Sequence, residues 1–139
     1  MIYLKRLIFS IIILISCSTN TDPIDTISSD YDVYIRPTGD ADLDYQEFSF
    51  INISNDTLYY VGLFKTLPLY TAQMQSDTGW VQYNFWRCGN GVKLIKFEPS
   101  EIVKTNVYLP PENLPWRVGL SVRKEPDGER YYCWSAVQN

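Results

Sequence analysis

A regular series of short β-rich segments separated by turn residues constrains the fold of this 139-residue chain more than any other feature. Residues 116–123 show the pattern most clearly, because apolar and polar side chains alternate along them. Nine such segments, with no helical periodicity among them, predict an all-β antiparallel β-sandwich of about seven to nine strands. The predicted strands cover residues 31–36, 45–53, 58–64, 69–75, 80–86, 92–97, 102–109 and 116–123, and a last strand after residue 129.

The last predicted hairpin turns at residues 125–129, whose proline and glycine suit a type I turn followed by a bulge. This turn would place Leu120 opposite Trp134 and make one face of the hairpin wholly apolar. Tyr131 and Cys133 would then point outward. A two-residue loop would shift the register by one residue and turn both side chains inward. The better apolar match favours the first register.

The N-terminal segment has the form of an export signal, because Lys5 and Arg6 precede a short apolar run at residues 7–15. A helix needs about 20 apolar residues to cross a bilayer, so this run is too short to stay as a membrane span. Leu14-Ile15-Ser16-Cys17 matches a complete lipobox, and the segment therefore resembles the signal of bacterial lipoproteins. The resemblance implies cleavage before Cys17 and attachment of a diacylglycerol to its sulfur. Ser18 in the next position favours the outer membrane.

This interpretation divides the chain into a signal peptide at residues 1–16, a flexible polar tether at 17–30 and one domain at 31–139. With Cys17 lipidated, Cys88 and Cys133 form an even pair in an exported protein, for which a disulfide is the default prediction. Such a bond would stabilise the fold by roughly 4 kcal/mol in the chain-entropy model. Two reduced thiols in the core are the alternative.

The charge of the chain limits its partners and its chemistry. Sixteen acidic residues against 12 basic ones give a net charge of −4, which becomes −6 once the signal is removed. We therefore expect no binding of nucleic acid, which needs clustered basic residues. Because the chain has no histidine, a serine or cysteine nucleophile would lack its usual base. We expect no enzyme activity, no catalytic residue, no metal and no cofactor; the acidic segment 40–44 lacks the spacing of a calcium-binding EF-hand.

Several turn and core elements resemble the small immunoglobulin-like domains of bacterial lipoproteins. These elements are Asn52 and Asn55 after an apolar strand, Trp80, the corner at residues 86–91, the turn at 99–101 and the strand at 117–120. Some of these domains are similar to the intracellular proteinase inhibitor type of sandwich. The resemblance covers residues 31–137 and implies an immunoglobulin-like architecture, while it implies almost nothing about activity.

Aromatic residues make up 15% of the chain and could either fill the core or stack on a partner. We expect Trp116 and Trp134 in the core, because both fall on the apolar face of the predicted last hairpin. The positions of Trp80 and Trp86 stay open at this point.

Five residues are candidate sites of contact or modification. Tyr131 would lie beside Arg117 and Arg123 on the predicted outer face, and these three form the candidate binding patch. Thr26 and Thr57 each stand between an aspartate and an aliphatic residue. This tripeptide resembles one that certain bacteria O-glycosylate on exported proteins, which implies glycosylation of both threonines.

Together these features predict a lipid-anchored protein of the cell envelope, at the outer membrane, with a non-enzymatic binding or accessory role. Its partners would be the membrane, through the lipid, and a protein or glycan. Two alternatives stay open. A protease inhibitor would use the proline-stiffened loop at residues 109–115, which is otherwise a crossover between strands. A small envelope hydrolase would need two carboxylates facing each other across a cleft.

Overall fold

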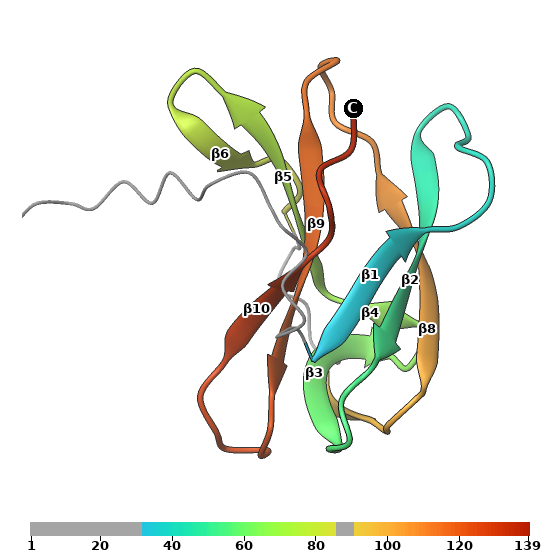
Figure 1. The fold of residues 1–139 in the computed structure, drawn as a ribbon, viewed down its shortest axis with the longest axis vertical. Coiled ribbons are helices and arrows are strands. Elements are labelled where there is room, and N and C mark those ends of the chain that lie inside the picture. Colours follow the sequence, from blue (N-terminus) through green and yellow to red (C-terminus); the bar gives the residue numbers. More distant parts are fainter. Residues whose placement is uncertain (1–31, 86–90) are drawn as a thin grey trace, which may run out of the picture.

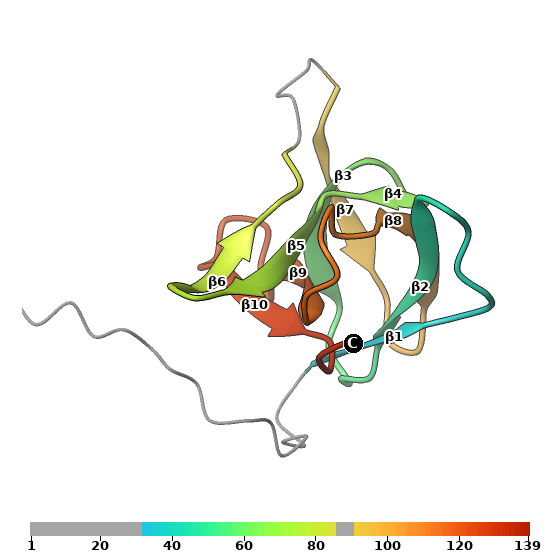
Figure 2. The same cartoon turned by 90° about the horizontal axis from the view of Figure 1, so that it is seen from above.

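The computed structural model describes residues 32–85 and 91–139, and within these ranges it contains ten strands and no helix. The strands form two antiparallel sheets that lie face to face (Figures 1 and 2). The prediction of an all-β antiparallel sandwich is confirmed. The immunoglobulin-like relationship and the division at residues 1–16, 17–30 and 31–139 stay predictions. In the described part of the chain, no helix is long and apolar enough to span a membrane.

The smaller sheet has three strands in the order β1-β2-β8. Its central strand, β2, pairs with both neighbours, so that Phe50 lies between Ile35 and Val103. Alternate side chains of all three strands point inward, as expected for a sheet with one buried face. The strands are β1 (Val33–Pro37), β2 (Tyr45–Asn52) and β8 (Ile102–Tyr108).

The larger sheet has seven strands and is built around β9 (Trp116–Arg123). Strand β10 pairs along one edge of β9, while β5 and then β3 pair along the other edge. Strand β6 extends the sheet beyond β5, and β4 and β7 pair with β3. The remaining strands are β3 (Leu58–Phe64), β4 (Leu67–Pro68), β5 (Tyr70–Ser76), β6 (Gly79–Gln82), β7 (Lys93–Phe97) and β10 (Tyr131–Trp134).

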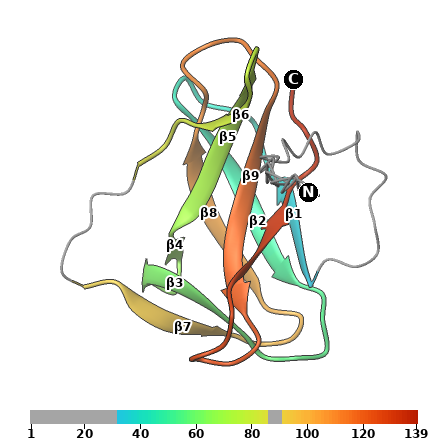
Figure 3. The same cartoon turned by 90° about the vertical axis from the view of Figure 1, so that its left-hand side faces the viewer.

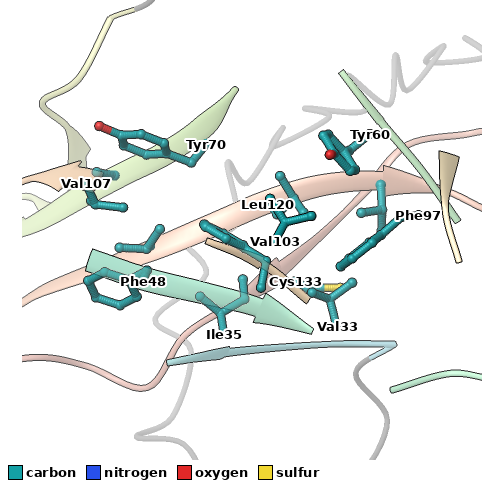
Figure 4. Close-up of a cluster of buried hydrophobic side chains, with 14 of the residues drawn as sticks. Val33, Ile35, Phe48, Tyr60, Tyr70, Phe97, Val103, Val107, Leu120 and Cys133 are labelled. Atoms are coloured by element: carbon teal, nitrogen blue, oxygen red, sulfur yellow. The ribbon is translucent and has the colours of Figure 1, made fainter. Parts of the chain in front are cut away.

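The core lies between the two sheets and receives side chains from both (Figure 4). Phe48 of the smaller sheet meets Trp116 of the larger one edge to face, with ring centroids 5.5 Å apart. Tyr60 and Phe97 make a second edge-to-face pair at 5.5 Å. Each fully buried large apolar side chain stabilises the fold by about 1.5–3 kcal/mol. Trp116 is 6% exposed and lies in the core, as predicted.

Most strands lie where the sequence predicts them, because apolar alternation and turn residues are local signals. The two-residue strand β4 was not predicted, since two residues show no periodicity. The segment predicted at residues 80–86 corresponds to β6, which begins at Gly79 and ends at Gln82.

The predicted register of the last hairpin is wrong by one residue. Tyr131 pairs with Val122 and Cys133 pairs with Leu120, so Tyr131 and Cys133 point toward the core. Trp134, predicted in the core, lies on the outer face beside Gly119. A Cβ atom added at Gly119 would lie 2.6 Å from the Trp134 ring, which shows how closely the indole covers the glycine. The apolar pattern of the inner face, on which the predicted register rests, does not contain this contact on the outer face.

Candidate functional site

The outer face of the larger sheet carries the residues that are best placed to meet a partner. Figure 3 views this sheet with β6, β5, β9 and β10 toward the reader and the smaller sheet behind it. On these four strands the alternate side chains that point away from the core are aromatic, basic or neutral polar. They are Thr71, Gln73, Gln75, Trp80, Gln82, Arg117, Ser121, Arg123, Tyr132 and Trp134, with Gly119 among them.

Four of these residues, Trp80, Arg117, Trp134 and Tyr132, form a continuous stack that we call the aromatic row. The Arg117 guanidinium carbon lies 4.3 Å from the centroid of the Trp80 ring and 4.4 Å from that of the Trp134 ring. The Trp134 and Tyr132 rings continue the stack, with centroids 5.3 Å apart and an angle of 15° between their planes. The row crosses from β6 over β5 to β9 and β10.

Strand pairing fixes the positions of the aromatic row. Trp80 stands opposite Gln75 in the β5–β6 hairpin, and Gln73 stands opposite Arg117 in the next ladder. Gln73 also accepts a hydrogen bond from Arg117 Nε to its Oε1 atom at 3.1 Å. A cation on an aromatic face contributes about 0.5–2 kcal/mol, depending on how far it is desolvated. The row is therefore ordered, yet Tyr132 is still 48% exposed.

The structure divides the predicted binding patch. Arg117 and Arg123 both lie on the outer face, as predicted, but they stand six residues apart on β9 and so about 20 Å from each other. Arg123 donates from Nη1 to the Pro126 carbonyl at 3.0 Å. Tyr131 points to the inner side, so the prediction that it lies beside the two arginines is wrong. Among the described residues, the buried atoms Ser121 Oγ and Arg123 Nε have no hydrogen-bond partner.

Tyr131 instead joins the last hairpin to the start of the domain. Its hydroxyl donates to Asp32 Oδ2 at 2.5 Å, and the Lys124 ammonium lies 3.6 Å from the same oxygen. Lys124 also lies 3.8 Å from an oxygen of Asp56. Burial, followed by the hydrogen bond to Asp32, raises the pKa of Tyr131 far above the usual range for tyrosine. Tyr131 is therefore a structural contact in this fold and does not belong to the outer face.

The described structure contains Cys133 as a free, buried thiol. Burial raises the pKa of this thiol, which disfavours the reactive thiolate. The prediction that Cys133 faces outward is wrong, because its side chain lies in the core. Cys88 lies outside the described residues, so its pairing with Cys133 stays a prediction. Cys17, with its predicted lipid, also lies outside them.

The two predicted glycosylation sites differ in what can be said of them. Thr57 lies between the bend at residues 54–56 and β3, is partly exposed, and its hydroxyl donates to Glu98 Oε2 at 2.7 Å. Thr26 lies outside the described residues. Glycosylation of both threonines stays a prediction. Within residues 32–85 and 91–139, no three acidic or cysteine side chains gather closely enough to hold a metal ion.

Two adjoining hollows open beside Tyr70 and Tyr108, with volumes of about 500 and 560 Å³. The Tyr83 hydroxyl donates to the Tyr108 carbonyl at 2.7 Å, and the Tyr70 hydroxyl accepts from the Tyr108 amide at 3.1 Å. Glu47 is the one carboxylate among the described residues that line the two hollows. Paired carboxylates across a cleft are therefore not found here.

The loop at residues 109–115, the candidate inhibitory loop, connects β8 of the smaller sheet to β9 of the larger one. Leu109 packs against the core, and its amide donates to the Asp44 carbonyl at 3.0 Å. Pro111, Glu112 and Asn113 at its tip are exposed. The loop thus has the geometry of a crossover between the two sheets.

Comparison with models of known protein families, with curated proteins and with solved structures finds no match to this chain. Sequence reasoning found Arg117 but missed Tyr132, placed Trp134 in the core and left Trp80 open. One signal for the missing residues was present, since Gly119 interrupts the outward side of β9 and leaves room for a large ring from the neighbouring strand.

Proposed function

We propose that this chain is a lipid-anchored envelope protein that binds a partner without catalysis, through the aromatic row on the outer face of its larger sheet. The stack of Trp80, Arg117, Trp134 and Tyr132 carries this proposal, because it is an ordered arrangement of rings that stays partly open to solvent. Tryptophan, tyrosine and arginine are the residue types that supply most of the energy at binding interfaces.

The order of the row supports binding further. A side chain that is already held in one rotamer loses little entropy when a partner arrives, and that loss otherwise costs about 0.5–1.5 kcal/mol for each side chain. Arg117 is held by two rings and by Gln73, and Trp134 is held by Arg117 and Gly119. The surface is thus prepared before contact.

The lipid anchor in this proposal rests on the lipobox that ends at Cys17. Attachment at the outer membrane would keep the domain close to a bilayer, and the row would then meet its partner near that surface. Cys17→Ser should release the protein from the membrane fraction and abolish incorporation of labelled fatty acid. Retention of both in the variant would contradict the anchoring.

The two alternatives receive less support from the described residues. Residues 109–115 have an exposed tip, but they serve as the crossover between the two sheets, and Leu109 packs against the core. A hydrolase would need two facing carboxylates, and the hollows beside Tyr108 have only Glu47 among their lining residues.

The binding proposal is tested by removing one ring from each outer face. Tyr132 and Tyr34 are exposed to a similar extent, 48% and 43%, but only Tyr132 belongs to the row. We expect Tyr132→Ala to weaken capture of the natural partner from envelope extracts at least tenfold, and Tyr34→Ala to leave it unchanged. Equal capture by Tyr132→Ala and the unaltered protein would show that the row is not the binding site.

A further inference from the structure

On the basis of the proposed binding function, we infer that the partner of the aromatic row is an acidic glycan, a polysaccharide that carries carboxylate or sulfate groups. The first observation is the distribution of charge. The seven strands of the larger sheet contain four basic residues and no acidic one, although the whole chain has 16 acidic and 12 basic residues. The basic residues are Lys93, Lys96, Arg117 and Arg123.

The acidic residues of the described chain lie elsewhere. Glu47 is on the smaller sheet, Asp32 precedes β1, and the others are in the segments between strands. The strands of the larger sheet are therefore basic in an otherwise acidic protein. Because these strands carry positive charges and no negative ones, they attract anions. They are therefore electrostatically complementary to an anionic partner.

The second observation concerns the side chains around the row. On β5, β6, β9 and β10 no outward residue is aliphatic; the neighbours of the rings are the neutral polar side chains of Thr71, Gln73, Gln75, Gln82 and Ser121. The centre of a protein–protein interface is usually apolar and tightly packed. Amides and hydroxyls beside exposed rings suit a ligand covered with hydroxyl groups better.

The third observation is the shape of the stack. The stacked rings of Tyr132 and Trp134 cover one face of each other, and Tyr132, which ends the row, offers an exposed aromatic surface because it is 48% accessible. The apolar face of a sugar ring can lie on such a surface, while its hydroxyls reach the polar side chains at the rim. Carboxylate or sulfate groups along the glycan would meet the basic residues, since guanidinium groups bind oxyanions through paired N–H donors.

The test uses the full chain purified from membranes and a panel of immobilised polymers. The acidic glycans are alginate, polygalacturonate and chondroitin sulfate; dextran is the neutral glycan, and polyglutamate is the acidic peptide. We expect retention on at least one acidic glycan, reduced at least tenfold by Tyr132→Ala and unchanged by Tyr34→Ala. Raising NaCl from 50 to 500 mM should weaken it, and dextran and polyglutamate should not retain the protein. Circular dichroism of both variants checks that they are folded.

Other outcomes would overturn the inference. Equal retention on dextran would remove the role of charge, and retention on polyglutamate through Tyr132 would make the partner an acidic peptide. Retention on none of the acidic glycans, or retention that Tyr132→Ala leaves unchanged, would also overturn it. In these cases the proposed function still stands if Tyr132→Ala weakens capture of the natural partner, so the two failures are distinguishable.

Discussion

The two outer faces of the sandwich differ in how their charged and aromatic side chains are arranged. On the smaller sheet, Lys104 lies 3.7 Å from Glu47 across the β2–β8 ladder, and Tyr45 packs on Tyr108 with ring centroids 4.6 Å apart. On this face, therefore, a basic side chain is paired with an acidic one, and an aromatic ring is packed against another ring. On the larger sheet the charged residues of the strands are all basic, and the rings of Trp80 and Trp134 both stack on Arg117.

This difference shows how a surface can be ordered without being neutralised. A salt bridge holds two side chains but cancels their charges, whereas a cation between two indoles is held in place and keeps its charge. The larger sheet can therefore present positive charge in a fixed position.

The largest effect should come from filling the space under the Trp134 ring. Gly119→Val would place its Cβ atom 2.6 Å from that ring, so the indole or the β9–β10 ladder must move. We expect a loss of about 3 kcal/mol in the free energy of unfolding, measured in urea. Ser121→Ala, two residues along the same face, is the control and should cost less than about 1 kcal/mol. A Gly119→Val protein as stable as the unaltered one would show that the indole does not depend on the glycine.

An intermediate effect is expected on the inner side of the same hairpin. Tyr131→Phe removes the hydrogen bond to Asp32 and should cost about 2 kcal/mol, as for other hydrogen bonds to charged groups. The raised pKa of Tyr131 means that the fold favours the neutral phenol. This contribution is complete below pH 10, the ordinary value, and is lost as the pH rises through the higher value of the folded protein.

Tyr60 provides an internal reference for that alkaline loss. Burial raises the pKa of Tyr60 to about 12, and its hydroxyl donates to the Lys65 carbonyl at 2.5 Å. We therefore expect the unfolding free energy to fall from pH 10 upward in the unaltered protein, and less steeply in Tyr131→Phe. Urea titrations between pH 8 and 11 measure both slopes. Parallel slopes would mean that Tyr131 ionises as easily when folded as when unfolded.

The smallest effects on the free energy of unfolding should come from removing one basic side chain from each outer face. Arg117→Ala removes a cation held by two rings and a hydrogen bond, so we expect a loss of about 1 kcal/mol. Lys104→Ala removes an exposed ion pair on the smaller sheet and should cost about 0–0.5 kcal/mol. The cost of Lys104→Ala should shrink further in 0.5 M NaCl, because salt screens exposed pairs. Equal losses of unfolding free energy for the two substitutions would show that the basic side chains of the two faces are held equally strongly.

The strands were predictable and the site was only partly so, for a physical reason. Alternation along residues 116–123 is local, and it places Trp116 inside and Arg117 outside without knowledge of any neighbour. The contacts that make the row belong to different strands, so they depend on register. Trp80 reaches Arg117 across β5, and the register of β10 depends on the fit of Trp134 to Gly119, which the apolar pattern of the inner face does not contain. The link from Tyr131 to Asp32 spans 99 positions and leaves no local pattern.

The absence of acidic residues from the strands of the larger sheet has a consequence for how the protein responds to its surroundings. The chain has no histidine, the side chain that ordinarily changes its charge between about pH 5 and 8, and these strands have no carboxylate. Within that interval, a partner whose binding to the row depends on pH does so through its own ionisable groups. The pH dependence of binding would therefore report the ionisation of the partner.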